Sequence, residues 1–343
     1  MRVEYSVFHK SQGMMRAALK GSLAALYLWS LAVSAVASYG DHAAARALVD
    51  ELVAEERGLD RERLLAVLAQ AERQEAILEA MSRPAERVKP WYEYRQIFLT
   101  EQREQEGLVF FAAHRETFAR AETEFGVPAE IILAIIGVET YYGRIAGSYR
   151  VIDALATLAF DYPRRSAFFS KELKNYLILT AGQQMDPLAM KGSYAGAMGY
   201  GQFMPSSYRA YAVDFDGDGV TDIWNNPVDA IGSVANYLRR HGWRSGETIV
   251  VAAEVGPDVP DALFNAGLVP ERTVAELAAA GLRSAQPLAP DAKATAIRFE
   301  LEEGHEYWLG LHNFYVITRY NHSAMYAMSV QQLSERLAAG MQL

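Results

Sequence analysis

The feature that most constrains the fold is an apolar stretch at residues 130–143, EIILAIIGVETYYG. Residues 131–138 carry no polar side chain, and Pro128 stands where the first residue of a helix would be. A helix of this composition has no polar face, so it has to be buried on all sides. We therefore expect a body of helices around it, with one carboxylate, Glu139, where the apolar run ends.

At that position Glu139 is expected to hold its proton more tightly than usual. Ile132, Ile135 and Ile136 lie one and two turns back on the same helical face, and loss of hydration raises the pKa of a carboxyl group. The partial negative charge of a helix C-terminus acts in the same direction. A glutamic acid with a pKa near neutrality can serve as a general acid. The alternative is that Glu139 only marks where the helix emerges into solvent.

A second segment, GSYAGAMGYGQFMPSSY at residues 192–208, combines glycine, tyrosine, methionine and one glutamine without any charged residue. Glycine permits a close approach of the backbone to a ligand, and aromatic faces with an amide group suit a sugar-binding groove. We expect a loop of this kind followed by a helix. The alternative is a buried glycine-rich loop with no ligand.

Composition excludes several classes of function. The 343 residues carry a net charge of −9 without a long run of Lys or Arg, which argues against nucleic-acid binding. The chain has no Cys, so disulfides, thiolate metal sites, Cys nucleophiles and acylation of an N-terminal Cys are all excluded. The length corresponds to about two to three domains.

The N-terminus is typical of a processing signal. Arg16 and Lys20 precede an uncharged run at residues 21–40, and Ala35 and Ala37 would occupy positions −3 and −1 of a cleavage site. We predict a signal peptide at residues 1–37 and an exported, periplasmic protein that is soluble after cleavage. An uncleaved N-terminal anchor is the alternative.

The remaining chain predicts an α+β protein that is mainly α. We expect an N-terminal helical region at 38–90, a helical core at 91–244, a small β-rich domain at 245–312 and a C-terminal segment at 313–343 that returns to the core. Strands are predicted for 247–255, 294–304 and 305–321, because these stretches are β-branched, aromatic and partly alternating. A single helix is predicted over 110–125, ended by Gly126.

The acidic segment DFDGDGVTDIWNNPVD, at residues 214–229, predicts a cation site of the EF-hand type. Clustered carboxylates repel one another unless a cation lies between them, and oxygen ligands select Ca²⁺ or Mg²⁺. The loop departs from the standard form at position 12, where Asn225 replaces a bidentate Glu. Its first positions are filled by Asp214, Asp216 and Asp218 at 1, 3 and 5, Gly219 at 6, and the Val220 carbonyl at 7. An acidic loop that holds no cation is the alternative.

Five motifs, GVETYYG, DALATLAFDYPRR, KGSYAGAMGYGQFMPSSY, DAIGSVANYLRRHGW and FYVITRYNHSAMYA, together resemble the B-type lytic murein transglycosylases. The resemblance covers roughly residues 85–330, in order and with similar spacing. It implies a lysozyme-like core that cleaves peptidoglycan between N-acetylmuramic acid and N-acetylglucosamine. Glu139 would be the catalytic acid and then the base, and the product would carry a 1,6-anhydromuramoyl end. A hydrolytic lysozyme on the same core and a non-catalytic, Ca²⁺-dependent peptidoglycan-binding protein are the alternatives.

The resemblance also implies further site residues. Arg164 and Arg165 would bind substrate carboxylates, Asp229 would close the cation loop, and Asp222 would contribute a ligand through water. The ion would be a structural Ca²⁺, with no organic cofactor, and we expect a monomer acting on glycan strands. Endo or exo cleavage, the peptide-stem requirement and partner enzymes stay open. The groove would be lined by Tyr94, Ser193, Tyr200, Gln202, Phe203 and Tyr237, with Tyr320, Asn321 and Tyr326 beside Glu139.

Overall fold

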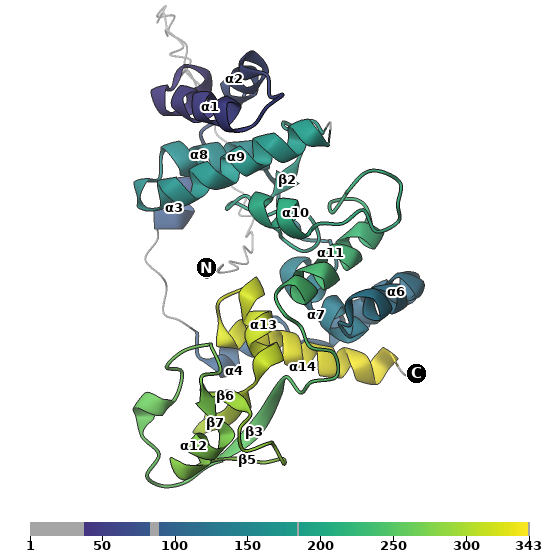
Figure 1. Ribbon diagram of the computed structural model, residues 1–343, viewed down its shortest axis with the longest axis vertical. Coiled ribbons are helices and arrows are strands. Elements are labelled where there is room, and N and C mark those ends of the chain that lie inside the picture. Colours follow the sequence, from purple (N-terminus) through teal and green to yellow (C-terminus); the bar gives the residue numbers. More distant parts are fainter. Residues whose placement is uncertain (1–37, 83–88, 184, 342–343) are drawn as a thin grey trace, which may run out of the picture.

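The computed structural model describes residues 38–82, 89–183 and 185–341, so the predicted signal peptide lies outside it. Figure 1 shows an elongated molecule: the N-terminal helices lie at one end, a helical body occupies the middle, and a sheet forms the other end. Within the described ranges, none of the helices combines the length and apolar character that a membrane span requires.

The predicted buried helix forms the centre of the body. Helix α7 (Ala129–Thr140) begins directly after Pro128, and every residue from 131 to 138 is buried. It is covered by α5 (Glu101–Ala113), α6 (Arg115–Phe125), α11 (Pro227–Arg240) and α14 (Ala324–Met341). The expectation of a helix enclosed by other helices is therefore confirmed.

The N-terminal end of the molecule is built on a helix pair. Helices α8 (Val151–Phe160) and α9 (Ser166–Gly182) pack against each other, joined by a short 3₁₀ turn, η3 (Pro163–Arg165). The buried carboxylate of Asp153, on α8, accepts a hydrogen bond from the Glu72 amide at 2.9 Å. This bond attaches the segment around Glu72 to α8. The other elements here are η1 (Tyr39–Asp41), α1 (Ala43–Glu55), α2 (Arg61–Ala69), α3 (Glu75–Ser82), β1 (Tyr149–Arg150), β2 (Lys191–Gly192) and α10 (Pro205–Tyr211).

The sheet at the opposite end is antiparallel, with strand order β4-β6-β7-β3-β5. One group of side chains, which includes Ala296 and Leu309, forms a small core of its own with α12. Ile297 and Phe299 of β6 join the main core, where Phe299 stacks on Trp91 with ring centres 4.8 Å apart. The elements are β3 (Val250–Val255), η4 (Asp261–Leu263), β4 (Arg272–Thr273), α12 (Val274–Ala279), β5 (Leu282–Ser284), β6 (Lys293–Glu300) and β7 (His305–Gly310).

Two predicted elements were wrong in extent. The strand expected over 305–321 ends at Gly310, and α13 (His312–Tyr320) follows it, because Phe314, Val316 and Ile317 are buried at helical spacing. The helix expected over 110–125 is broken at His114, which leaves the helical conformation. This break lets the rings of Phe111 and Phe118 approach to 5.5 Å in one core.

Candidate active site

Glu139 lies in the last turn of α7 and is half-buried. The hydroxyl of Tyr326, from α14, donates a hydrogen bond to its Oε1 at 2.6 Å. Burial raises the pKa of Glu139 to about 7, and the Tyr326 hydrogen bond opposes this with a smaller effect. The predicted direction of the pKa shift is confirmed, and Glu139 does not simply emerge into solvent.

The end of α7 is held by a basic residue that sequence reasoning missed. Arg103, from α5, donates hydrogen bonds to the carbonyls of Gly137 and Ile97, and its guanidinium lies 4.5 Å from the ring centre of Tyr141. It therefore places positive charge at the negative end of the helix. Tyr141 and Tyr142 follow with φ of 53° and 59°, a left-handed turn that costs energy outside glycine.

The glycine-rich segment lies directly beside this turn. The Thr140 hydroxyl donates to the Tyr200 carbonyl at 2.9 Å, and the Tyr200 amide donates to the Ile223 carbonyl at 3.0 Å. The Tyr320 hydroxyl donates to the Gly201 carbonyl at 2.7 Å. Three other parts of the chain thus fix two consecutive residues, Tyr200 and Gly201, next to the end of α7, consistent with a loop built for close approach.

Gln202 and Ser193 are held in defined orientations within this segment. The Gln202 side-chain amide donates to the carbonyls of Ala146 and Gly199, at 3.1 and 3.0 Å. Both amide hydrogens are therefore engaged, and the side chain offers its carbonyl oxygen to a ligand. The Ser193 hydroxyl oxygen accepts from the Ala197 amide at 3.0 Å and stays half-buried.

Phe203 and Tyr237 were predicted to line the groove, but both are buried. Their rings pack around Tyr320, with ring centres 6.0 and 4.6 Å away, and the Tyr237 hydroxyl donates to the Arg319 carbonyl at 2.7 Å. They lie behind Tyr320 and support it. Direct contact of these two rings with a ligand stays a prediction.

The remaining predicted groove residues lie on three other elements. Tyr94, half-buried, is on α4 (Trp91–Tyr94), and the exposed Arg164 is on η3 beside Arg165. The Arg165 guanidinium lies 4.3 Å from the ring centre of Phe168. Asn321 follows α13, and in the described part of the chain its buried Oδ1 has no hydrogen-bond partner. An orphaned buried acceptor of this kind suits a ligand N–H or O–H.

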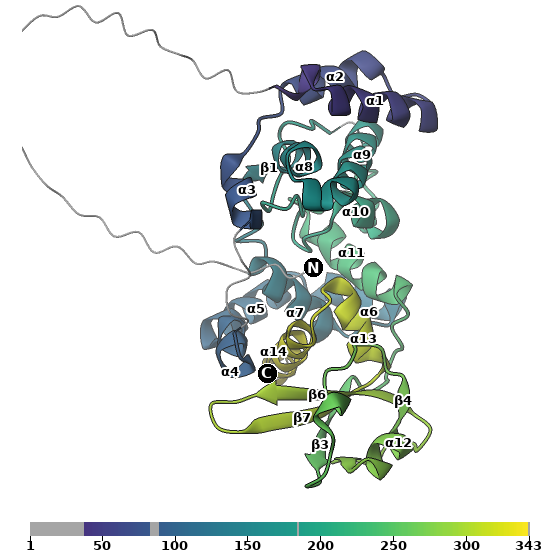
Figure 2. The same ribbon diagram turned by 90° about the vertical axis from the view of Figure 1, so that its left-hand side faces the viewer.

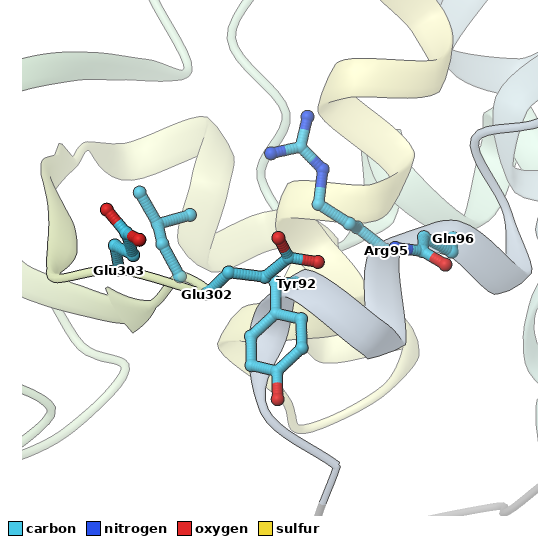
Figure 3. A pocket seen from close by; sticks show the side chains of 6 residues that line it. Tyr92, Arg95, Gln96, Glu302 and Glu303 are labelled. Atoms are coloured by element: carbon cyan, nitrogen blue, oxygen red, sulfur yellow. The ribbon is translucent and has the colours of Figure 1, made fainter.

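An open hollow lies between the α4 region and the turn that joins β6 to β7 (Figure 3). Glu139 is not among its lining residues, so this hollow is separate from the site around the catalytic helix. Its walls are formed by Tyr92, Arg95 and Gln96, the last two on η2 (Arg95–Ile97), and by Leu301, Glu302 and Glu303.

Sequence reasoning also missed Phe110 and Thr140. The Phe110 ring lies 6.0 Å from that of Tyr200 and 5.9 Å from that of Tyr142, which places an aromatic side chain from α5 beside the glycine-rich segment. Helical periodicity in α5 gives no signal for this contact. Thr140 could have been noticed, because it is the polar residue next to Glu139 at the end of an otherwise apolar helix.

The acidic loop brings three of its predicted ligands together. Carboxylate oxygens of Asp214, Asp216 and Asp229 lie within 4.8 Å of one another. Asp229 is fully buried and accepts hydrogen bonds from the amides of Phe215 and Asp222, both at 2.7 Å. Burial raises the pKa of Asp229, and the nearby charge of Asp216 adds to this. Three converging carboxylates with spare lone pairs fit a hard cation such as Ca²⁺.

Asp218 lies outside this group of three. Its Oδ1 accepts a hydrogen bond from the Val220 amide at 2.8 Å. The Asn225 side-chain amide donates to the carboxylate of Asp222 at 3.0 Å. Asn225 is thus engaged within the loop, whereas Asp229 faces the other ligands, which favours Asp229 as the residue that closes the site.

Fold and site together define a transglycosylase. The chain belongs to the family described as Transglycosylase SLT domain, whose family model matches residues 41–335. It is similar to membrane-bound lytic murein transglycosylase B of Escherichia coli (strain K12), with 47% identity over 304 residues, which cover 86% of this chain and 82% of that protein. This membership confirms the predicted family and the predicted class of enzyme, a lytic transglycosylase.

Two solved structures share the fold. Soluble lytic transglycosylase SltB1 from Pseudomonas aeruginosa is 53% identical, with a TM-score of 0.84 over 88% of this chain and 100% of that chain. Escherichia coli lytic transglycosylase Slt35, solved in complex with calcium, is 45% identical, with a TM-score of 0.81 over 89% of this chain and 96% of that chain. The predicted fold class, mainly α with a lysozyme-like core and a small sheet, is confirmed.

Proposed function

We propose that this chain cleaves the glycan strands of peptidoglycan between N-acetylmuramic acid and N-acetylglucosamine, leaving 1,6-anhydromuramoyl ends. The observation that carries the proposal is Glu139, a half-buried carboxyl with its pKa raised to about 7, hydrogen-bonded by Tyr326 and next to the glycine-rich segment. The name of the Escherichia coli relative, a murein transglycosylase, supports the same substrate.

In this mechanism Glu139 acts twice. Protonated Glu139 donates its proton to the glycosidic oxygen as the bond from that oxygen to the anomeric carbon breaks. The carboxylate then takes the proton of the muramoyl C6 hydroxyl, whose oxygen bonds to the anomeric carbon. The enzyme returns to its starting state and no water is consumed. A pKa near 7 suits a group that must be acid and base in one turnover.

Hydrolysis on the same core is the competing reaction. A retaining hydrolase uses a second carboxyl about 5–5.5 Å from the first, and an inverting one uses a wider pair. The motif GVETYYG contains Glu139 as its single acidic residue, which favours the internal C6 hydroxyl over water as nucleophile.

Mass spectrometry of a purified peptidoglycan digest in ¹⁸O water distinguishes the two reactions. Transglycosylation yields muramoyl products that are one water molecule lighter than reducing ends and carry no ¹⁸O. Stoichiometric incorporation of ¹⁸O would make the enzyme a lysozyme. Binding of peptidoglycan without any new product would make it a non-catalytic binding protein.

We further propose that the predicted groove residues contact the glycan strand. Gln202 and Asn321 each present an acceptor oxygen to hydroxyl or amide groups of the sugars. Arg164 and Arg165 would bind lactyl or peptide carboxylates through charge-assisted hydrogen bonds. Tyr94, Ser193 and Tyr200 would line the groove, with Phe203, Tyr237 and Tyr320 as their support.

The acidic loop is proposed to bind one structural Ca²⁺ through Asp214, Asp216 and Asp229. Asp218 and the Val220 carbonyl would complete the ligand set, and Asp222 would act through water. The solved calcium complex of Slt35 supports the choice of ion. The ion takes no part in the proposed chemistry and holds the segment between α10 and α11.

We propose that residues 1–37 are a signal peptide that directs the enzyme to the periplasm, and these residues lie outside those that the structure describes. We also propose that the domain boundaries follow residues 90, 244 and 312, and that the protein is a monomer. Without Cys, attachment to a membrane through an acylated Cys is excluded.

A further inference from the structure

Thr140, the residue after the catalytic glutamate, is almost completely buried, with 1% of its surface exposed. Its hydroxyl oxygen accepts a hydrogen bond from the Gly143 amide at 3.0 Å. Its single hydrogen can go to the Tyr200 carbonyl at 2.9 Å or to the Ile136 carbonyl, which is further away at 3.2 Å. The hydroxyl therefore joins the end of α7 to the turn after it and to the glycine-rich segment.

Three groups of Tyr200 have defined contacts: its carbonyl, its amide and its ring. Its carbonyl accepts from Thr140, and its amide donates to the Ile223 carbonyl of the acidic loop. Its ring lies so close to Gly143 that a Cβ on Gly143 would collide with it. The Gly143 amide is in turn bonded to Thr140. One hydroxyl thus determines the distance between the carboxyl-bearing helix end and a predicted wall of the groove.

We propose that Thr140 is a positioning residue of the transglycosylase reaction: its hydroxyl fixes the glycine-rich segment relative to Glu139, so that the bound glycosidic oxygen meets the acid. The inference rests on the proposed function and deepens it. Tyr141 and Tyr142 both adopt the left-handed conformation, which makes the turn after Thr140 energetically unfavourable by itself. The hydrogen bond from the Gly143 amide to the Thr140 hydroxyl joins the two ends of this turn and stabilises it.

The experiment compares Thr140→Val, which keeps the shape and removes the hydroxyl, with Thr140→Ser, which restores it. The matched control is Thr180→Val, because Thr180 is 3% exposed and, among the residues that the structure describes, its hydroxyl bonds only to Tyr176 and Leu177 of its own helix. Rates on purified peptidoglycan give kcat and KM at temperatures well below every Tm. Hydrogen exchange of the Gly143 and Tyr200 amides reports the local structure.

We expect Thr140→Val to lower kcat at least about tenfold with KM within about threefold, and Thr140→Ser to stay within about threefold of wild type in both. Thr180→Val should lower Tm to a similar extent and leave kcat within about twofold. The hydrogen-exchange rate of the Gly143 amide should rise in Thr140→Val and stay at the wild-type value in Thr180→Val.

The pH profile separates positioning from a general loss of structure. A smaller folded fraction scales the rate equally at every pH, whereas a displaced Glu139 also moves the pH at which the rate falls. Tyr326, Tyr320 and Tyr237 face Glu139, and none of them is altered by these variants. Wild-type kcat in folded Thr140→Val, or equal losses in Thr140→Val and Thr180→Val, overturns the inference. An inactive wild-type enzyme overturns the proposed function instead.

Discussion

The molecule places carboxylates in two opposite ways. Glu139 stands at the end of an apolar helix, with a raised pKa and a tyrosine hydroxyl as its neighbour. In the acidic loop, carboxylate oxygens of Asp214, Asp216 and Asp229 lie within 4.8 Å of one another, and backbone amides donate hydrogen bonds to Asp214 and Asp229. The first arrangement makes the charged form costly and favours the protonated one, and the second brings carboxylate oxygens together as a hard cation requires.

The difference teaches how environment selects between two uses of the same functional group. Loss of hydration without a compensating charge favours a neutral acid that exchanges protons near pH 7. Clustered carboxylates repel one another, and a cation between them relieves that repulsion. Each of the following experiments perturbs one of the two arrangements.

The largest effect is expected for Glu139→Gln. Loss of general acid–base catalysis costs about 10²–10⁴-fold in rate, and in the proposed mechanism one residue performs both steps. The release of soluble products from peptidoglycan should therefore fall by at least this factor, while peptidoglycan binding is retained. Glu130→Gln, in the first turn of the same helix, is the control and should keep its activity. Turnover of the Glu139→Gln variant at the wild-type rate would refute the assignment.

The next effect concerns the cation. A ligand that binds only the folded loop stabilises the protein by about 2.7 kcal/mol at a hundredfold excess over Kd. Ca²⁺ should raise Tm relative to EDTA, and Mg²⁺ should raise it less because it demands tighter geometry. Asp229→Asn should abolish the shift. An unmoved Tm at millimolar Ca²⁺ would exclude the site, and loss of turnover in folded, chelated protein would give the ion a catalytic role.

A smaller effect is expected on stability. The pKa of Glu139 is raised from 4.5 to about 7, so between these pH values the folded protein binds more protons than the unfolded chain, and stability falls as pH rises. Glu139→Gln removes this loss and should be more stable than wild type by about 2 kcal/mol at pH 8, less than the full shift implies because the carboxyl is half-buried. At pH 4 the two proteins should unfold at similar denaturant concentrations. Equal stability at both pH values would show that the carboxyl is well hydrated.

The smallest effect is expected for Asp218→Asn. Asp218 lies outside the converging group, and its Oδ1 accepts from Val220 as an Asn oxygen could. Without cation the variant should unfold within about 0.5 kcal/mol of wild type. Asp218 is a proposed ligand that lies outside the converging group, so Asp218→Asn should reduce the Ca²⁺-induced rise in Tm less than Asp229→Asn does. An unchanged rise would exclude Asp218 from the ligand set.

Features written into local sequence were predictable. The apolar run predicts the burial of α7 and the raised pKa of Glu139, because both depend on neighbours within two turns. The spacing of acids predicts the convergence of Asp214, Asp216 and Asp229, whereas cation binding there stays a prediction. Tyr326 was placed beside Glu139 only through the family resemblance, since 187 residues separate them.

Features that depend on packing between elements were not predictable. The hydrogen bond from Arg103 to Gly137 joins two helices, and nothing in the charge pattern of α5 marks it. The break at His114 and the helix after Gly310 follow from which side chains the body can bury, so periodicity within either segment misses them. Phe203 and Tyr237 have the composition of a sugar-binding surface and yet are buried behind it.

The separation between Glu139 and Tyr326 has a consequence for synthesis. A chain leaves the ribosome from its N-terminus, and its first segments fold first. Helix α7 is therefore made long before α14, the last described helix, delivers the Tyr326 hydroxyl and covers the buried face of α7. A chain that lacks α14 has the acid but neither its Tyr326 donor nor the part of the cover that α14 supplies. A chain truncated before α14 is therefore expected to leave Glu139 without the Tyr326 hydrogen bond.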